Sequence, residues 1–369
     1  MSMTEIRKQK YQEIIPVETR KEEKVEIVTE VNDEIIPVET RKEVNDEILT
    51  IENNDRFSLF PIRYPDMWKQ YKNHENTFWT VQEIDMSIDR KEWDTLSENE
   101  RTFIENILAF FANSDSIVLE NLVTNFCKEI TIPEARCFYG FQAMMENIHS
   151  EAYGLMIDTF VKDEKRKNEL YRAMETIPCV EQKAQWALDW IYRKKDKKDL
   201  ARRLFAFGIV EGLFFSGSFC AIFWLKEKGK LINSLGKSNE WIARDEALHT
   251  DFAILLYSYI KNKISEEEAI DIMKEAVLIE EQFICHSLSV DMIGMSKEMM
   301  SQYIRFVADR LMVQFGYSII YEAVNPFPFM QKISLDGKTN FFEQRVSEYS
   351  IPNSISEDNF NFNNFDEIF

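Results

Sequence analysis

Hydrophobic residues recur along most of the chain at the three- and four-residue spacing of a helix with one buried face. The clearest run begins at a capping box, in which Ser97 is followed by Glu100. Apolar residues then keep helical spacing as far as Cys127, at Phe103, Ile104, Ile107, Leu108, Phe111, Val118 and Leu122. The same pattern predicts further helices over 136–160, 180–193, 200–228, 239–261, 265–288 and 296–315.

Signals for other fold classes are absent from the sequence. There is no regular alternation of strands and crossover helices, no GxGxxG and no P-loop motif, which disfavours a doubly wound nucleotide-binding fold. Only ten Gly and nine Pro occur in 369 residues, as is typical of long helices with few tight turns. The sequence therefore predicts an all-α protein.

Both ends of the sequence differ from the helical part. The segment EIIPVETRKE occurs at 13–22 and again at 34–43, and so short a charged, Pro-bearing repeat cannot bury enough surface to fold alone. The last twenty residues are Asn-rich, acidic and punctuated by Phe, which indicates a flexible peptide that docks on a partner. We expect a disordered repeat-containing tail over 1–55, a helical domain over 56–346 and a C-terminal docking tail over 347–369.

The composition indicates which kinds of partner to exclude and in which cellular compartment to expect the protein. Lys and Arg number 44 against 64 Asp and Glu, a formal charge of −20, which argues against nucleic acid as a partner. The five cysteines form no CxxC motif and indicate reduced thiols; they are Cys127, Cys137, Cys179, Cys220 and Cys285. The N-terminus has no apolar signal core, so we expect a cytoplasmic protein.

One apolar segment imitates a membrane span. Residues 204–225 are long enough to cross a bilayer, but Glu211 lies near their middle. A helix that is apolar all round is equally typical of the centre of a large helical bundle. We favour the bundle, because a buried carboxylate needs a partner and a metal ion is the partner that best suits it.

Two of the four histidines share the same local pattern. Glu146 precedes His149 by three residues, and Glu246 precedes His249 by three, so each pair lies on one helical face. Both pairs could simply be exposed helix pairs, but the apolar flanks around His149 favour burial and ligation. Bundles with dinuclear carboxylate centres also use one carboxylate from each of two further helices. The candidates for these are Asp115 and Glu211.

The ligand types indicate the metal. Four carboxylates and two imidazoles suit iron or manganese, whereas structural zinc prefers a closed site rich in Cys and His. The sequence contains no HExxH motif, which excludes a zinc protease of that type. Tyr153 follows His149 by one helical turn, so its phenol should approach the metals. It is either an ordinary core tyrosine or the group that a bound oxidant converts to a radical.

The sequence resembles the small, radical-generating subunit of class I ribonucleotide reductase, in its eukaryotic and large-DNA-virus form. The matching stretches run in order from about 56 to 349 and read FPIRYPDMWKQYK, FWTVQEIDMSID, ILAFFANSDSIVLENL, EARCFYGFQAMMENIHSEAY, VEGLFFSGSFCAIFWLK, RDEALHTDFA, IRFVADRLM, VNPFPFM and GKTNFFEQRVSEY. The resemblance implies a ferritin-like helical bundle with a dinuclear metal centre, two iron ions or else manganese, and a homodimer.

The resemblance also implies roles for individual residues. The six metal ligands would be Asp115, Glu146, His149, Glu211, Glu246 and His249. Tyr153 matches the radical tyrosine, and its protecting apolar pocket would consist of Phe215, Phe219 and Ile242. Trp79 and Asp245 match a relay beside His149, and Tyr349 matches the tail tyrosine that passes the electron to the large subunit.

The implied activity is that of a ribonucleoside-diphosphate reductase, active only together with a large catalytic subunit that the C-terminal tail would bind. The ending NNFDEIF departs from the commonest eukaryotic ending, and the N-terminal repeats lie outside the family pattern. The alternatives are a ferritin-like ferroxidase, a diiron oxygenase and a non-enzymatic assembly protein. We expect His74, His286 and the cysteines to be structural, because none lies in a ligand-spaced cluster.

Overall fold

The computed structural model describes residues 48–51, 57–193, 199–287 and 289–330. All of these belong to one of the two compact units into which the protein divides, Asp46–Phe369. The predicted C-terminal tail and almost all of the predicted N-terminal tail lie outside the described residues, so their boundaries stay predictions.

The described part is built from helices, and no strand occurs in it. Its longer helices are α4 (Glu98–Asn121), α6 (Pro133–Phe160), α9 (Pro178–Ile191), α10 (Asp199–Ile209), α11 (Ser216–Glu227), α12 (Leu235–Tyr259), α13 (Glu266–Glu281) and α14 (Lys297–Phe315). The shorter ones are α2 (Pro65–Glu75), α3 (Ser87–Trp93), α5 (Cys127–Glu129), α7 (Glu164–Tyr171) and α8 (Ala173–Thr176), with single turns of 3₁₀-helix at η1 (Ile48–Thr50), η3 (Val81–Glu83) and η7 (Val290–Ile293).

All of the predicted helices are present, with ends that differ by a few residues. The capping box at Ser97 forms as predicted, with Glu100 N donating to Ser97 Oγ and Ser97 N donating to Glu100 Oε2. The 239–261 helix begins earlier than predicted, at Leu235. The short helices α2, α3, α7 and α8 were not predicted, because segments this short and polar carry little hydrophobic periodicity.

Three of the helical stretches contain a π-helical turn, which the sequence pattern did not predict. These turns are η4 (Leu122–Phe126), η5 (Val210–Phe214) and η6 (Gln282–Ser287). The predicted helix over 200–228 is therefore α10, η5 and α11 in succession, with Glu211 inside the π-helical turn. Such turns insert an extra residue into a helix and often mark functional positions.

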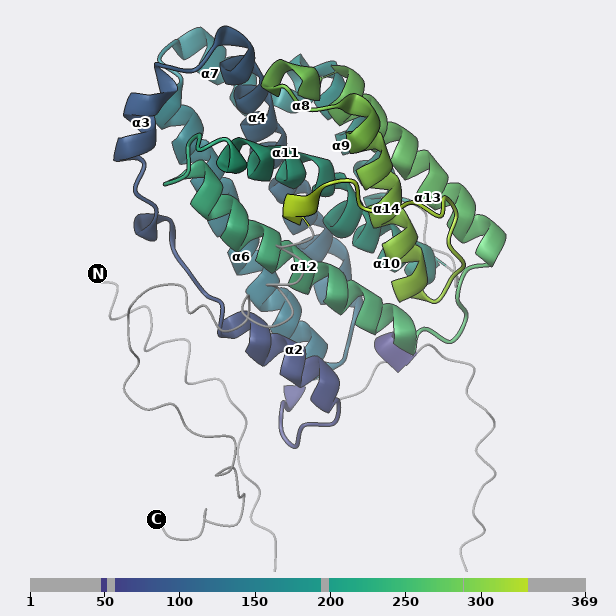
Figure 1. The fold of residues 1–369 in the computed structure, drawn as a ribbon. Helices are drawn as coiled ribbons and strands as arrows, with labels where there is room; N and C mark the ends of the chain where they lie inside the picture. Colours follow the sequence, from purple (N-terminus) through teal and green to yellow (C-terminus); the bar gives the residue numbers. More distant parts are fainter. Residues whose placement is uncertain (1–47, 52–56, 194–198, 288, 331–369) are drawn as a thin grey trace, which may run out of the picture. The chain divides into compact units, whose positions relative to one another are not determined.

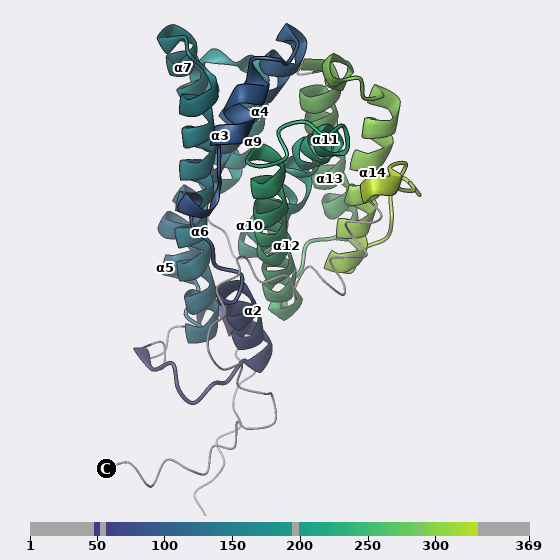
Figure 2. The ribbon, with the colours of Figure 1, turned by 60° about the vertical axis from the view of Figure 1, so that its left-hand side comes forward.

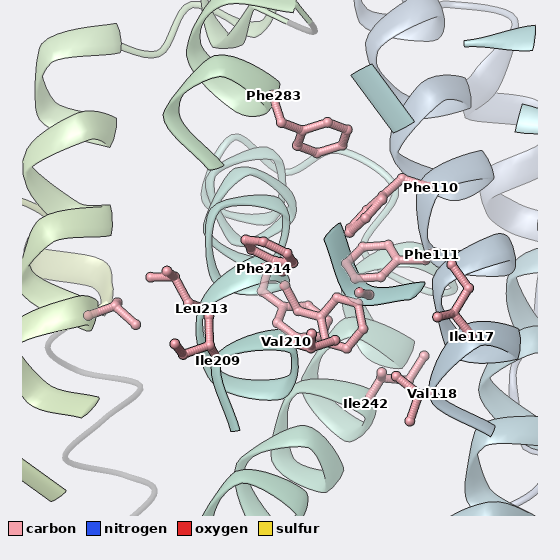
Figure 3. Packing of buried hydrophobic residues seen from close by; sticks show 14 of the residues in the cluster. Phe110, Phe111, Ile117, Val118, Ile209, Val210, Leu213, Phe214, Ile242 and Phe283 are labelled. Carbon is pink, nitrogen blue, oxygen red and sulfur yellow. The ribbon is translucent and has the colours of Figure 1, made fainter. Parts of the chain in front are cut away.

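The long helices pack in pairs that share one core. Helix α4 lies along α6, α10 along α12 and α13 along α14 (Figure 1), and Figure 2 shows the three pairs one after another across the bundle. Aromatic side chains fill the space between the pairs. Phe110 and Phe111 of α4 lie near Phe214 of η5 and Phe283 of η6 (Figure 3).

By length and hydropathy alone, two described stretches could cross a membrane, Glu98–Glu129 and Asp199–Glu227. In the second, 94% of the most apolar window is buried inside the protein. This burial is what we predicted for the central helix of a bundle.

Candidate metal centre

Six carboxylate and histidine side chains from four helical segments converge in the interior of the bundle. Asp115 comes from α4, Glu211 from η5, and the two ExxH pairs from α6 and α12. Each of the six is at most 2% exposed. They are the six residues that were predicted from the sequence as candidate ligands: Asp115, Glu146, His149, Glu211, Glu246 and His249.

The six side chains form two overlapping groups, each compact enough to hold one metal ion. One group contains Glu146, Glu211, Glu246 and His249, and the other contains Asp115, Glu146 and His149. Within each group, one ligand atom from every residue lies within 4.8 Å of the others. Because Glu146 belongs to both groups, the arrangement fits two neighbouring metal ions.

Both histidines turn the same ring nitrogen toward the carboxylates. Nδ1 of His149 lies 3.1 Å from Glu246 Oε1, and Nδ1 of His249 lies 2.9 Å from Glu246 Oε2 and 3.1 Å from Glu146 Oε1. The opposite nitrogens, Nε2, point away from the cluster. Nδ1 is therefore the atom that each imidazole can offer to a metal.

Several buried polar atoms of the cluster lack a hydrogen bond. They are both carboxylate oxygens of Asp115, one oxygen each of Glu146, Glu211 and Glu246, and Nδ1 of His149. Burying such atoms without partners is costly, and cations would satisfy them. Oxygen-rich donors with two imidazoles suit iron and manganese. The residues present therefore fit a dinuclear metal centre.

Crowding of the carboxylates changes their proton affinities. Burial and the neighbouring charge of Glu146 raise the pKa of Asp115 well above its usual range, and burial with the charge of Glu246 does the same for the pKa of Glu211. Although burial opposes it, the charges of Glu246 and Glu146 raise the pKa of His249 to about 9. The cluster without metal therefore retains protons that bound cations would displace.

Trp79 and Asp245, the two residues predicted as a relay, lie directly behind His149. Oδ2 of Asp245 accepts a 2.8 Å hydrogen bond from Trp79 Nε1 and lies 3.1 Å from His149 Nε2. The Arg244 guanidinium donates to Oδ1 of Asp245 at 3.0 Å. Although burial opposes it, Arg244 and the hydrogen bond to His149 hold the pKa of Asp245 at about 2. Asp245 is thus an ionised acceptor that orients the imidazole of His149.

Tyr153 is 1% exposed, and its hydroxyl has no hydrogen-bond partner. Its ring stacks on Phe111 with centroids 4.6 Å apart and planes 5° from parallel. Burial and the charge of Asp115 raise the pKa of the phenol well above its usual range. The phenol therefore stays protonated next to the carboxylate cluster.

The predicted pocket residues Phe215, Phe219 and Ile242 are all buried. Phe215 and Phe219 pack on Phe111, with ring centroids 5.7 and 5.0 Å away. Ile242 belongs to the same buried hydrophobic core as Val118 and Phe111, and all three are labelled in Figure 3. Phe111, which was predicted only as a core position, is thus the ring that links Phe215 and Phe219 to Tyr153.

Other residues near the cluster were missed. Gln142 donates a 2.8 Å hydrogen bond to Glu211 Oε1, and its position one turn before Glu146 was a usable signal. Tyr139, two turns before Glu146, is fully buried with a hydroxyl that also lacks a partner. His74 lies 3.3 Å from His249 between Nε2 atoms, a contact that no sequence spacing indicates.

The remaining candidates divide into two groups. Tyr349 and the side chain of His286 lie outside the described residues. Within the described residues none of the five cysteines forms a disulfide; Cys220 and Cys285 are buried, and the other three are partly exposed.

Comparison with known proteins yields one family. Residues 56–326 match the family described as "Ribonucleotide reductase, small chain". A ribonucleoside-diphosphate reductase small chain of Arabidopsis thaliana is 54% identical over 312 residues, which cover 90% of that relative and 84% of the protein described here. The small chain of Trypanosoma brucei brucei is 56% identical over 299 residues, covering 88% and 81%. The small chain of Vaccinia virus (strain Ankara) is 53% identical over 310 residues, covering 96% and 84%.

Solved structures agree with this result. The ribonucleotide reductase Rnr4 homodimer from Saccharomyces cerevisiae matches with a TM-score of 0.70 and 39% identity, covering 92% of the yeast protein and 78% of this one. The dimanganese(II)-NrdF of Streptococcus sanguinis has a TM-score of 0.65 at 18% identity, covers 96% and 74%, and supports the fold alone. The ferritin-like fold is thereby confirmed, and the ferroxidase and oxygenase alternatives are not favoured. The chain belongs to the ribonucleotide reductase small chain family.

Proposed function

We propose that this protein is the radical-generating subunit of a ribonucleoside-diphosphate reductase, with Tyr153 as the residue that carries the radical. The observation that supports this role most directly is the placement of a buried, protonated phenol beside the carboxylate and histidine cluster. Asp115, Glu146 and His149 would hold one metal ion, and Glu146, Glu211, Glu246 and His249 would hold the other. When bound, two iron ions would supply, with dioxygen, the power to oxidise a nearby phenol by one electron.

Tyr153 would lose one electron and its phenolic proton, which leaves a neutral radical. That proton needs an acceptor, and Asp115 would take it, because its charge acts most strongly on the phenol and both of its carboxylate oxygens lack a hydrogen-bond partner. The stacked ring of Phe111 and the apolar side chains of Phe215, Phe219 and Ile242 would then exclude water and reductants. A long-lived radical needs such an enclosure.

Trp79, Asp245 and Tyr349 would carry the oxidising equivalent outward. The hydrogen bond from Trp79 to Asp245 supports the first step, because it connects a buried indole to the outer nitrogen of His149. Tyr349 would pass the equivalent to the large catalytic subunit, where the ribonucleotide is reduced. In the reverse direction an electron is withdrawn from Tyr153 again after each turnover, which restores its radical.

The tails and the helical domain would have separate roles in the assembled enzyme. The large subunit would bind the tail at 347–369, the residues at 1–55 would form a second tail without an assigned role, and the domain at 56–346 would hold the metal centre. The homodimer of the 39% identical yeast protein supports a homodimer here. We expect this assembly in the cytoplasm.

Electron paramagnetic resonance tests the proposal. Ferrous iron and air are added to the metal-free protein, and the bound iron is counted per polypeptide. About two irons and a tyrosyl signal are expected for a dinuclear centre of this type. A tyrosyl signal that forms only when manganese is added in place of iron would contradict the iron assignment.

Tyr153→Phe should bind the same iron without the tyrosyl signal. Tyr139→Phe is the matched control, because Tyr139 lies on the same helix, is equally buried and also lacks a hydroxyl partner. A signal that survives Tyr153→Phe and disappears in Tyr139→Phe would move the radical to Tyr139. Two irons without any signal would instead indicate a ferroxidase or an oxygenase.

A further inference from the structure

The two histidines of the cluster differ in what lies behind them. Nε2 of His149 faces the carboxylate of Asp245 at 3.1 Å. Nε2 of His249 faces another imidazole, with Nε2 of His74 at 3.3 Å. The centre is therefore backed by an ionised acid on one side and by a histidine on the other.

His74 is held firmly in this position. It lies in the last turn of α2 and is 0% exposed. Its ring packs against Phe138 and Phe141 at centroid distances of 5.1 and 4.8 Å. The backbone N–H and the hydroxyl of Thr77 both donate to the carbonyl oxygen of His74, at 3.0 and 2.8 Å. Such a setting leaves the ring little freedom to turn away from His249.

The chemistry of two facing imidazoles determines which one donates. A metal on Nδ1 of His249 requires that nitrogen to be unprotonated, so the ring proton of a neutral His249 must lie on Nε2. This proton then points at Nε2 of His74, which has to act as the acceptor. The proton of His74 must in turn lie on its Nδ1, an atom that has no hydrogen-bond partner.

We propose that His74 is a positioning residue of the metal centre, whose Nε2 accepts the hydrogen bond that fixes the orientation and the tautomer of His249. This inference rests on the proposed function, since it takes His249 as a metal ligand. Partners of this kind on metal-bound imidazoles typically contribute about 10–100-fold in metal affinity. A neutral acceptor also increases ligand basicity less than a carboxylate does, so His74 and Asp245 make the two metal positions inequivalent.

Manganous ion alone is a suitable probe. The electron paramagnetic resonance signal of free Mn²⁺ gives the concentration of unbound ion, and hence of bound ion, without any enzyme turnover. The metal-free protein is titrated at constant pH, and about two Mn²⁺ per polypeptide are expected for a dinuclear centre. His74→Leu should weaken one of the two binding steps by about 10–100-fold and leave the other unchanged. His74→Gln should restore the wild-type value, because its amide oxygen can accept the same proton.

Phe141→Leu serves as the packing control. Phe141 contacts the His74 ring edge-on and forms no hydrogen bond with it, so its truncation loosens the packing but keeps the Nε2 acceptor, and any loss of Mn²⁺ affinity should be much smaller than that of His74→Leu. Thermal unfolding of the metal-free variants shows that each is folded, and His74→Phe replaces His74→Leu if the latter does not fold.

Two results would overturn the role of His74. One is wild-type affinity at both steps in the apolar variant, and the other is a loss that His74→Gln fails to restore, since that would indicate packing alone. A different result is expected if the proposed dinuclear metal centre itself does not exist. In that case the wild-type protein would not take up two Mn²⁺, or His249→Ala would leave both binding steps intact.

Discussion

The indole of Trp79 donates a 2.8 Å hydrogen bond to Oδ2 of Asp245, across 166 residues of sequence. The same oxygen lies 3.1 Å from Nε2 of His149. One carboxylate thus connects a tryptophan between α2 and η3 to a candidate ligand on α6. Because Asp245 immediately precedes Glu246, the position of α12 sets both the connection and a ligand.

Trp79→Phe should separate metal binding from radical transfer. Phenylalanine keeps the apolar contacts but removes the donor, so metal content and the Tyr153 signal should persist. Nucleotide reduction with the large subunit should fall by about 100-fold or more. Loss of a hydrogen-bond partner behind a metal ligand typically costs about 10–100-fold, so the expected effect lies at or above the upper end of that range. Trp93→Phe is the control, because Trp93 is also buried but stacks on Phe160 instead. Full activity in Trp79→Phe would remove Trp79 from the relay.

How far the sequence predicts this site depends on the separation of the residues involved. The two ExxH pairs are local, so helical spacing alone places each Glu beside its His. Asp115 and Glu211 could be proposed as ligands because a buried carboxylate needs a partner, and a metal ion is the partner that suits it best. His74 does not follow, because it lies on a short polar helix and its partner is 175 residues away. The π-helical turn at Glu211 could not be predicted either. In a segment that is apolar on all sides, the hydrophobic pattern does not change where an extra residue is inserted into the helix.

Lys183 is another residue whose position could not be predicted, because a lysine on an amphipathic helix usually faces solvent. Here its side chain is 1% exposed and pairs with the fully buried Glu280 at 2.5 Å. Its ammonium also donates to the carbonyl of Phe214, at 2.6 Å, and lies 3.9 Å from the ring centroids of Phe110 and Phe283. The carbonyl belongs to the π-helical turn, so this pair supports the segment that carries Glu211.

Lys183→Met should lower the free energy of unfolding by about 3–5 kcal/mol, because it leaves Glu280 buried without its partner. Replacing both residues, as Lys183→Met with Glu280→Leu, should recover most of that loss. Lys167→Met is the surface control: Lys167 pairs with Asp158, which is 64% exposed, and its loss should cost far less than the loss of Lys183, because exposed ion pairs contribute little. Urea titrations measure all three, and equal costs for Lys167→Met and Lys183→Met would refute the distinction.

The same lysine should make stability depend on pH in alkaline solution. Burial, only partly offset by Glu280, lowers the pKa of Lys183 from 10.5 to about 8. Between these values the unfolded protein binds more protons than the folded one, so the free energy of unfolding should rise with pH across that window. The rise should be present in the wild-type protein and absent from Lys183→Met, measured by urea unfolding at several pH values. Parallel pH profiles for the two proteins would contradict the lowered pKa.

Gly212 follows Glu211 directly and brings η5 close to two other helices. A Cβ at this position would lie 2.9 Å from Leu311 Cδ2 of α14 and 3.0 Å from Thr250 Cγ2 of α12. Because Thr250 is the neighbour of His249, Gly212→Ala should push Glu211 away from the cluster. We expect a net loss of about 1–3 kcal/mol in stability from overpacking, together with weaker Mn²⁺ binding.

Gly140→Ala provides the control for that substitution, because Gly140 lies within α6 and nothing lies within 4 Å of the added Cβ. There the better helix propensity of alanine should raise stability by up to about 1 kcal/mol and leave Mn²⁺ binding unchanged. Opposite signs for the same chemical change would show that contact with α12 and α14, rather than helix propensity, determines the requirement for glycine beside Glu211. A stabilising Gly212→Ala with wild-type Mn²⁺ affinity would instead mean that η5 can move without displacing its carboxylate.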